Sequence, residues 1–332
     1  MAKLHRVSLN GATFPARSGQ LLLDAALMSG AEIPHDCRAG RCGTCITKVE
    51  RGITLGGETQ QHGMIHACQA RVFSDLSLAI EALPPVDRVE ARVARLVNVT
   101  HDVVEVTLAP ATPLDLLPGQ YCRFTFHGFP PRAFSPTAAL DGRSEPGRIH
   151  LNIKRVRDGC VSPNLGGKIR PGHRVTIDGP FGHAFLRPHR DNRLILAGSG
   201  TGFAPMWAVA HAALCENALR DIVLIAGVRA LASFYMGPAL DFAGTFPNVR
   251  IIATVQERQS DFPQVRFGRP TDHLPELEAG DTIYAAGAPA MVDALGKLAL
   301  AAKSSFYSDP FEPAAAQAED WITRAVAWLR TG

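Results

Sequence analysis

The sequence predicts a multidomain chain of α+β and α/β class: a small α+β domain, an antiparallel β-barrel and a parallel α/β domain, in that order. Three observations predict this organisation. Four cysteines gather within residues 37–68, short alternating runs fill residues 91–180, and a glycine-rich turn near residue 200 joins an apolar strand to a helix. The chain has 332 residues, about twice the length of a typical domain, so each part has room for its own core.

Composition and charge narrow the class of protein. Hydrophobic residues make up 46% of the chain and charged residues 20%, as in an ordinary globular protein. The net charge of +3 is small and the basic residues are scattered, so we expect no nucleic-acid partner. The N-terminal residues lack the apolar run of a signal peptide, and no stretch reaches the roughly 18 apolar residues of a membrane span. We therefore expect a cytoplasmic protein without a membrane partner.

The small domain is marked by its cysteines. The segment CRAGRCGTC spans residues 37–45 in the spacing C-x4-C-x2-C, and a fourth cysteine follows in HACQA. This is the spacing of plant-type [2Fe–2S] clusters. Gly40 and Gly43 would let the loop turn and bring backbone N–H groups close to an anionic cluster. The expected ligands are Cys37, Cys42, Cys45 and Cys68.

Two other uses of these cysteines compete with a cluster. Zinc also binds four thiolates, but structural zinc sites usually present two short C-x2-C knuckles, whereas Cys68 stands alone. A disulfide framework does not suit a chain with seven cysteines, an odd count, in a compartment that keeps thiols reduced. His35, His62 and His66 flank the loop, and we expect them to support it or lie at the surface, because four thiolates already complete the site.

The elements around the cysteines follow a recognisable order. We expect a strand in residues 5–16, a helix in residues 21–30 and, beyond the loop, a strand in residues 46–52. Together with the cysteine spacing, this order resembles the β-grasp fold of plant-type ferredoxins, over residues 1–82. The resemblance implies that this domain holds a [2Fe–2S] cluster.

A different pattern follows the small domain. Residues 81–90, EALPPVDRVE, are rich in proline and charge and predict a linker. The next part, residues 90–188, alternates short apolar runs with Pro and Gly turns, which predicts a small antiparallel β-barrel. Its expected strands span residues 91–100, 103–110, 120–126, 148–156 and 173–180.

Two motifs in the barrel resemble the ferredoxin–NADP reductase superfamily. RAFS, Arg132 to Ser135, resembles its R-x-Y-S motif. The resemblance implies FAD, with Arg132 at the pyrophosphate, Phe134 stacked on the isoalloxazine and Ser135 hydrogen-bonded near flavin N5. Phe134 replaces the family's tyrosine, so the ring area survives and the hydroxyl is lost. Gly159 and Ser162 match a Gly-x-x-Ser/Thr turn that opens a helix, whose N-terminal N–H groups would face the pyrophosphate.

The last domain, residues 190–311, begins with an apolar strand, a glycine-rich turn and a helix in NRLILAGSGTGFAPMWAVAHAAL. Such a turn lets a dinucleotide phosphate approach the backbone at the N-terminus of a helix. GSGTGFAP resembles the superfamily's G-G-T-G-x-A-P signature, which implies that NADH or NADPH binds here. The matching residues are Gly198, Gly200, Thr201, Gly202 and Pro205. Further strands in DIVLIAGVR, NVRIIATV and DTIYAAGAP alternate with helices, as a parallel sheet requires.

Two segments near the end of this domain resemble parts of these reductases that approach the cofactors. AAGAPAMV resembles a C-G-P-x-x-M segment beside the nicotinamide, with Gly287 in place but Ala286 where a cysteine is common, which bears on hydride-transfer efficiency rather than on the fold. FYSDPF implies that Asp309 and Phe311 approach the flavin, while a plain edge strand is the alternative. EDWITRAVAWLRTG predicts a helical extension over residues 312–332, which would pack against the nucleotide-binding domain or contact a partner.

The choice between NADH and NADPH is expected to depend on GVRALASFYM, just after the second strand of this domain. NADH-preferring members of the superfamily often carry an acid near the position of Ser233, which accepts a hydrogen bond from the ribose 2′-hydroxyl and repels a 2′-phosphate. Ser233 is neutral and Arg229 lies nearby, but Arg229 also occurs in NADH users. The sequence leaves both nucleotides open.

The order of the three modules resembles the one-chain reductase components of ring-hydroxylating Rieske dioxygenases and related monooxygenases. It implies an oxidoreductase that takes hydride from NAD(P)H at FAD and passes single electrons through the cluster to a terminal oxygenase acting on aromatic compounds, by ring hydroxylation or demethylation. Ser135, Asp309 and Phe311 are the expected catalytic residues. The alternatives are service to a cytochrome P450 or di-iron monooxygenase, and a non-catalytic redox sensor.

Basic residues surround the expected electron exit. Arg38 and Arg41 lie in the cysteine loop, and Lys48 and Arg51 follow it. They predict either an acidic docking site on the oxygenase, reached through long-range steering, or simple compensation of the cluster's negative charge. If they dock the oxygenase, charge reversal at Arg41 should slow electron delivery to it but not to a small artificial acceptor.

Overall fold

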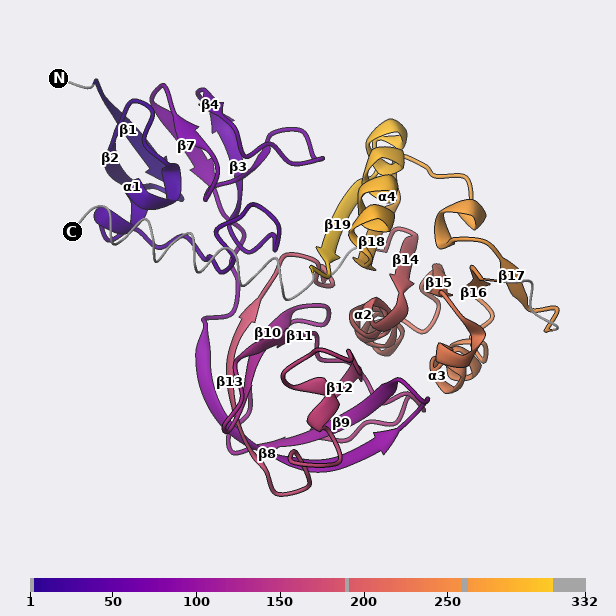
Figure 1. Cartoon of the computed structure of the whole chain (residues 1–332). Helices are drawn as coiled ribbons and strands as arrows, with labels where there is room; N and C mark the ends of the chain where they lie inside the picture. The colour runs from indigo at the N-terminus through magenta and orange to yellow at the C-terminus, as the bar shows by residue number, and fades with distance from the viewer. Residues whose placement is uncertain (1–2, 189–190, 258–261, 313–332) are drawn as a thin grey trace.

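The computed structural model of this chain describes residues 3–188, 191–257 and 262–312 and divides into three lobes, each built on its own sheet (Figure 1). Each lobe also encloses its own hydrophobic core. The helical extension expected from residue 312 onward lies outside the described residues, apart from Glu312. Within the described ranges, no helix is long and apolar enough to cross a membrane.

The first lobe is a mixed sheet with one helix, as the sequence predicts for the small α+β domain. Its strand order is β2-β1-β7-β3-β5, in which β1 and β7 are parallel and the other neighbours antiparallel. Helix α1 turns an apolar face into the core because Leu22, Leu23, Ala25 and Ala26 recur at helical spacing. The elements are β1 (Leu4–Leu9), β2 (Ala12–Arg17), α1 (Leu22–Met28), β3 (Ile46–Arg51), β4 (Thr54–Leu55), β5 (Met64–His66), β6 (Arg71–Val72) and β7 (Leu76–Ala79).

The stretch of residues 5–16 forms a hairpin rather than the single strand expected from the sequence. Strands β1 and β2 turn at Asn10 and Gly11, whose φ angles are 47° and 90°. Both angles lie in the left-handed region that a type I′ turn requires, and Asn-Gly adopts this turn readily. The Asn-Gly pair is therefore the hairpin signal within this alternating stretch.

The second lobe is an antiparallel sheet that curls into a barrel, with strand order β11-β10-β13-β8-β9-β12 (Figure 1). An isolated bridge between Thr137 and His150 brings the two edges together, so the barrel nearly closes and buries its free strand edges. The elements are β8 (Asp87–Asn98), β9 (Val103–Pro110), β10 (Tyr121–Phe126), β11 (Arg132–Phe134), β12 (Ile149–Lys154), the 3₁₀ turn η1 (Ser162–Asn164) and β13 (Arg174–Phe181).

The linker before the barrel is shorter than the sequence suggests. Strand β8 begins at Asp87, inside the expected linker of residues 81–90, because Asp87 and Arg88 pair with Gly179 and Asp178 on β13. The Arg88 guanidinium also forms an ion pair with the Asp178 carboxylate at 2.6 Å. Pairing with a strand far along the chain thus recruits residues whose local composition is that of a linker.

The third lobe is a parallel sheet with helices on both faces, as predicted. Its strand order is β17-β16-β15-β14-β18-β19. Helices α2 and α3 share one core with the sheet, and α4 shares a second core on the opposite face. The elements are β14 (Leu194–Ser199), η2 (Gly200–Gly202), α2 (Phe203–Glu216), β15 (Ile222–Val228), η3 (Leu231–Ser233), α3 (Gly237–Ala243), β16 (Val249–Val255), β17 (Val265–Phe267), η4 (Pro270–His273), β18 (Thr282–Gly287), α4 (Pro289–Ala302) and β19 (Ser305–Pro310).

Strand β14 is the switch point of this sheet. The chain adds β15, β16 and β17 on one side of β14 and then β18 and β19 on the other. In open parallel sheets, ligands bind at the carboxyl ends of the strands beside such a point. The fold therefore directs a ligand to the ends of β14 and β18, next to the glycine-rich turn.

A buried arginine joins the linker after the first lobe to the barrel and the third lobe. Arg187 has only 4% of its side chain exposed, and it donates hydrogen bonds to the carbonyl of Phe185 at 2.6 Å and to the carboxylate of Glu81 at 2.8 Å. Its guanidinium carbon lies 3.6 Å from the Phe185 ring centre and 3.8 Å from that of Tyr307 on β19. Burial alone would raise the pKa of Glu81, but the hydrogen bonds and charges of His183 and Arg187 outweigh it and lower that pKa to about 2. Arg187 thus ties the linker, the barrel exit and the last strand together.

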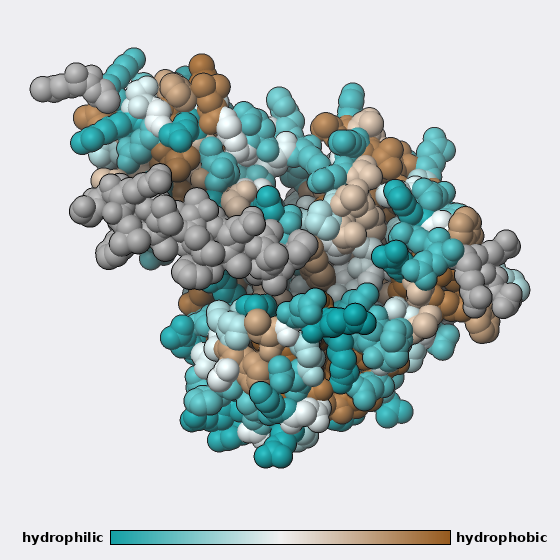
Figure 2. All heavy atoms as spheres, viewed as in Figure 1, coloured by the Kyte–Doolittle hydropathy of each residue, from teal (hydrophilic) through white to brown (hydrophobic). Residues whose placement is uncertain are grey.

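The face of the molecule displayed in Figure 2 is mainly polar. Figure 2 shows hydrophilic atoms over most of the displayed face, with hydrophobic groups scattered between them. Such scattered apolar exposure is normal for globular proteins. The chemistry of the chain is therefore better sought at the junctions between the lobes.

Candidate functional site

The four cysteines of the predicted cluster come together at the edge of the first lobe. Cys37 and Cys42 are half-buried, Cys45 and Cys68 are buried, and all are free thiols. They form two contacting pairs: contact with Cys42 lowers the pKa of Cys37 to about 5, and contact with Cys45 lowers that of Cys68 to about 7. Backbone N–H groups of Ala39 and Cys42 point at the sulfur of Cys37, at 3.3 and 3.4 Å.

This paired arrangement suits a binuclear cluster. In the described part of the chain, no three Cys, His, Asp or Glu side chains are grouped around one point as ligands of a single metal ion. Two thiol pairs offer two ligands to each of two irons, whereas zinc needs its four thiolates around one centre. The N–H groups aimed at sulfur would offset the negative charge of a cluster.

The cysteine loop rests against the barrel. The Thr44 hydroxyl accepts a hydrogen bond from the backbone N–H of Gly182 at 2.9 Å and lies 3.3 Å from the sulfur of Cys42. A Cβ on Gly43 would lie 3.2 Å from the Cβ of His183, so glycine allows the close approach of the two lobes there. The Thr44 hydroxyl therefore holds the cysteine loop on the barrel beside Cys42, one of the expected cluster ligands.

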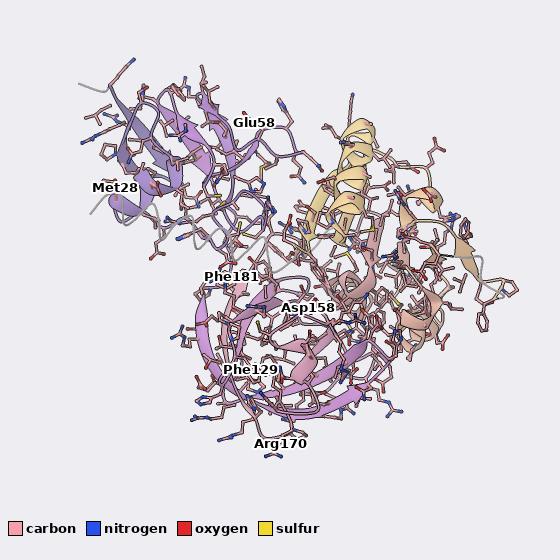
Figure 3. The ribbon with its side chains drawn as sticks, viewed as in Figure 1. Met28, Glu58, Phe129, Asp158, Arg170 and Phe181 are labelled. Carbon is pink, nitrogen blue, oxygen red and sulfur yellow. The ribbon has the colours of Figure 1, made fainter. Side chains whose placement is uncertain are left out.

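A second contact fixes the other side of the loop. Asp36, which precedes Cys37, accepts a hydrogen bond from the Tyr121 hydroxyl at 2.6 Å and forms an ion pair with Arg123. Both partners lie on β10, and the Tyr121 ring packs 5.7 Å from that of Phe181. Phe181, labelled in Figure 3, lies at the end of the barrel that faces the first lobe. The sequence motifs gave no sign of Asp36 or Tyr121.

The RAFS residues lie at the β11 edge of the barrel. Arg132 is half-buried and donates to the carbonyl of Pro131 at 2.8 Å. Phe134 is half-buried, with its ring 6.0 Å from that of Phe124 in the barrel core. Ser135 is only 7% exposed and donates a hydrogen bond to the carboxylate of Asp309 at 3.2 Å.

The turn at Gly159 and Ser162 is shorter than expected. Its helix is the single 3₁₀ turn η1, because Leu165 leaves in an extended conformation and Gly166 follows with φ of 88°. The Ser162 hydroxyl accepts a hydrogen bond from the backbone N–H of Val156 at 3.0 Å and so closes the loop that contains Gly159. A phosphate here would meet a few N–H groups rather than the dipole of a full helix, which corrects the expected helix opening.

The glycine-rich turn follows β14 as predicted. Gly198 ends the buried part of β14, Gly200 and Thr201 are half-buried in η2, and Pro205 lies in the first turn of α2. A Cβ on Gly202 would lie 2.3 Å from the carbonyl oxygen of Ala286, so only glycine lets this turn pack against the end of β18. The turn and Gly287 thereby share the carboxyl edge of the sheet.

Asp309 lies on β19, and Phe311 directly follows this strand. Asp309 pairs in register with Ala286 on β18, and burial raises its pKa to about 7 although the Ser135 hydrogen bond opposes the shift. Phe311 is half-buried, and its N–H donates to the carbonyl of Gly287 at 2.8 Å. Strand β19 is thus an edge strand and also brings Asp309 to the barrel, so the two sequence interpretations do not exclude each other.

The two residues expected to affect the choice between NADH and NADPH, Arg229 and Ser233, each contact an acidic side chain. Arg229 forms an ion pair with Glu257 at 3.1 Å. The Ser233 hydroxyl donates to Asp102, a barrel residue, at 2.9 Å. Neither acid lies near Ser233 in the sequence, so no local pattern reveals them.

Asn152 is a further polar residue that the motifs missed. It is 6% exposed, and neither its amide nitrogen nor its amide oxygen has a hydrogen-bond partner among the described residues. His150, two residues before Asn152 on β12, forms an isolated bridge with Thr137, two residues after Ser135. Asn152 also lies beside the buried hydroxyl of Tyr235 from the third lobe. The signal in the sequence is a polar residue inside the apolar run IHLNI.

The basic residues of the cysteine loop are paired. Arg41 forms an ion pair with Glu312 at 3.0 Å, and Arg38 lies 3.7 Å from Asp24. His66 is half-buried, and burial with the nearby His183 lowers its pKa, which keeps it neutral. The loop's positive charge is therefore partly compensated within the chain.

Comparison with known proteins gives the same three modules. Residues 6–73 match the model of the 2Fe-2S iron-sulfur cluster binding domain, residues 90–185 that of the oxidoreductase FAD-binding domain, and residues 196–297 that of the oxidoreductase NAD-binding domain. These matches agree with the three lobes and with the cofactors implied by the motifs.

Individual relatives match over almost their whole length. The chain is 30% identical to the aromatic O-demethylase reductase subunit of Amycolatopsis sp., over 87% of this chain and 92% of that protein. It is 32% identical to the reductase component of the naphthalene 1,2-dioxygenase/salicylate 5-hydroxylase systems of Ralstonia sp., over 85% and 90%. The crystal structure of the Amycolatopsis cytochrome P450 reductase GcoB superposes with a TM-score of 0.68 at 29% identity, over 93% of this chain and 99% of that one. The chain therefore belongs to the family of NAD(P)H-dependent reductases in which a plant-type [2Fe–2S] ferredoxin domain precedes an FAD-binding and an NAD-binding domain.

Proposed function

We propose that this protein is the reductase component of a Rieske-type oxygenase system that hydroxylates or demethylates aromatic compounds. The observation that carries the proposal is the docking of the cysteine loop on the barrel through Thr44 and Gly182, with Asp309 of the third domain on Ser135 of the same barrel. When bound, FAD would accept two electrons together as one hydride and release them singly to the cluster, which takes one electron at a time. An arrangement in which the barrel touches both other domains supports this relay.

In this proposal the cysteine loop holds the cluster. Cys37 and Cys42 would bind one iron, and Cys45 and Cys68 the other, since these are the contacting pairs. The Thr44 hydroxyl, beside Cys42 and hydrogen-bonded to Gly182, would keep this end of the cluster against the barrel.

The barrel supplies the proposed FAD residues. Arg132 would pair with the pyrophosphate, which Gly159 and Ser162 would approach through backbone N–H groups. Phe134 would cover the ring system, and Asn152 has a free donor and a free acceptor for a polar ring edge. The unpartnered amide of Asn152 supports a bound cofactor, because buried polar groups are normally hydrogen-bonded.

The third domain supplies the proposed nicotinamide residues. The glycine-rich turn would receive the dinucleotide phosphates at the N-terminus of α2. Gly287 would lie beside the nicotinamide and Phe311 beside the flavin, and Asp309 would orient the Ser135 hydroxyl at the flavin. The site residues of this turn are Gly198, Gly200, Thr201, Gly202 and Pro205.

Besides the di-iron monooxygenase that the sequence leaves open, two classes of oxygenase have a specific comparison in their favour. The relative named for a naphthalene dioxygenase system supports a Rieske partner. The similarity to a cytochrome P450 reductase supports a P450 instead. Arg38 and Arg41 would steer an acidic surface of either partner, although Asp24 and Glu312 reduce their free charge.

The first test is an anaerobic titration of the purified holoprotein with NADH and with NADPH, following flavin and cluster absorbance. We expect one or both nucleotides to bleach both chromophores. The reduced protein is then mixed with a purified oxidised Rieske oxygenase and, separately, with a purified ferric P450. Electron delivery only to the P450 would assign the alternative partner. If dithionite bleaches both chromophores and neither nucleotide does, the reductase proposal is wrong and a redox sensor becomes the better interpretation.

A further inference from the structure

A pocket lies at the carboxyl ends of the second and third strands of the NAD-binding domain. Its volume is about 260 Å³, and its lining consists of Ala230, Leu231, Ala232, Val255 and Glu257. The N–H groups of Gln256 and Glu257 donate to the carbonyl of Arg229 at 3.2 and 2.9 Å, which fixes the ends of β15 and β16 together. Small apolar walls with polar groups at the rim suit the adenosine end of a dinucleotide.

The cation at this rim already has a partner. The guanidinium of Arg229 lies 3.1 Å from the carboxylate of Glu257, and Glu257 also lines the pocket. A 2′-phosphate is recognised by cations that can form charge-assisted hydrogen bonds to it. The Glu257 carboxylate competes for Arg229 and repels a dianion.

The hydroxyl of Ser233, which follows the lining residue Ala232, is also engaged. The Ser233 hydroxyl donates a hydrogen bond to the Asp102 carboxylate at 2.9 Å. The Thr100 hydroxyl and the Lys154 ammonium contact the same carboxylate at 2.9 and 3.4 Å. Burial by itself would raise the pKa of Asp102, but these hydrogen bonds and the Lys154 charge lower it, so the carboxylate is ionised at neutral pH. Ser233 then has no proton to give to a phosphate oxygen.

We propose that this site selects NADH over NADPH, because Asp102 and Glu257 engage the two side chains that could bind a 2′-phosphate, and the Glu257 carboxylate at the pocket can accept a hydrogen bond from a ribose hydroxyl. The inference rests on the proposed function and specifies which nicotinamide nucleotide its NAD-binding domain accepts. Asp102 comes from the FAD-binding barrel, so two domains together set the selectivity. A hydroxyl donates to a carboxylate, whereas a phosphate dianion only accepts and is repelled.

The test compares wild type with Glu257→Gln and Asp102→Asn in the holoprotein. Wild type should reduce its flavin with kcat/KM at least about tenfold higher for NADH than for NADPH, and it should bind ADP more tightly than 2′,5′-ADP in calorimetry. Glu257→Gln should raise kcat/KM for NADPH by about threefold, the range of an exposed ion pair, and Asp102→Asn by about tenfold. Glu276→Gln removes an exposed carboxylate elsewhere in the same domain and should change neither ratio.

A double variant identifies the cation involved. Arg229→Gln added to Glu257→Gln should abolish the gain for NADPH, because the released guanidinium is the group that binds the phosphate. Equal or tighter binding of 2′,5′-ADP by wild type would overturn the inference. So would a preference for NADH that neither acid variant changes. If neither nucleotide reduces the flavin, the proposed function is wrong, while the comparison of ADP with 2′,5′-ADP still decides the inference.

Discussion

Ser135 and Asp309 join the FAD-binding barrel to the last strand of the NAD-binding domain. The Ser135 hydroxyl donates a hydrogen bond to Oδ2 of Asp309 at 3.2 Å, although the two residues are 174 positions apart. Only 7% of Ser135 and 9% of Asp309 are exposed. The contact therefore reports the closure of the nucleotide domain on the barrel, at the place where both cofactors are expected.

The raised pKa of Asp309 predicts a pH-dependent stability of the apoprotein. Burial lifts this pKa from 3.8 to about 7, so the stabilisation from the neutral acid is complete below about pH 4 and is lost as the pH rises through about 7. Asn cannot titrate, so the melting temperature of Asp309→Asn relative to wild type should increase between about pH 5 and about pH 8, by the equivalent of about 1–3 kcal/mol. Melting curves of both apoproteins across this range check the slope. A constant difference would contradict a buried titrating carboxyl.

Loss of an expected cluster ligand should remove iron without removing FAD. Cys45→Ser replaces a thiolate by a poor iron ligand, so iron content should fall from about two atoms per chain to near zero and the cluster absorbance should disappear. Flavin absorbance should stay, because the barrel core is separate from the first lobe. Cys215→Ser is the matched control, since Cys215 is an exposed thiol on α2. Zinc instead of iron in the wild-type protein would exclude the cluster.

The contact between Asp36 and Tyr121 should control how firmly the cysteine loop sits on the barrel. Tyr121→Phe removes only the hydroxyl that donates to Asp36, a hydrogen bond to a charged group worth about 1.5–3 kcal/mol. We expect faster proteolysis of the linker before β8 and slower reduction of the cluster by the flavin, with an unchanged rate of flavin reduction by nucleotide. Stopped-flow absorbance separates the two steps. Arg170→Gln changes an exposed residue at the opposite end of the same barrel (Figure 3), and an equal effect there would argue against a specific contact.

Arg187 should be among the residues most important for stability. Arg187→Met leaves the Glu81 carboxylate without its closest cation and removes the guanidinium from between Phe185 and Tyr307. Breaking a fully buried pair costs about 3–5 kcal/mol, and solvent screening of Glu81, which is 43% exposed, reduces the loss below that range, so the midpoint of chemical unfolding should fall by a smaller but measurable amount. Arg88→Met removes a fully exposed member of an ion pair in the barrel and should leave the midpoint nearly unchanged. Similar shifts in both variants would contradict the role of Arg187 at the domain junction.

Asn152→Leu should have opposite effects on stability and on FAD binding. Leucine has a similar size and removes two unpartnered polar atoms from a buried position, so the apoprotein should melt at the same temperature or higher. If the amide binds the cofactor, the dissociation constant of FAD should rise by about tenfold, the equivalent of one hydrogen bond. Fluorescence titration of the apoprotein with FAD measures it. Unchanged FAD affinity would remove Asn152 from the site.

Local patterns in the sequence predicted the three domains and most of their elements. The strand, turn and helix around Gly198 to Pro205 and the alternating strands of the barrel appear in the structure as expected. One error came from pairing with distant residues, and the others came from local turns that interrupt a regular pattern. Asp87 and Arg88 joined a strand because β13 offered partners, and the turn at Ser162 ended early because Leu165 and Gly166 leave the helical conformation.

The sequence by itself determined the cysteine spacing, the strand periodicity and the glycine-rich turn, because each depends on residues a few positions apart. Only the tertiary structure decided which side chains meet between the domains. Asp36 and Tyr121 are 85 positions apart, and Ser233 and Asp102 are 131 apart. These contacts exist because the surfaces of the lobes pack against one another, and this packing joins residues that no local pattern relates.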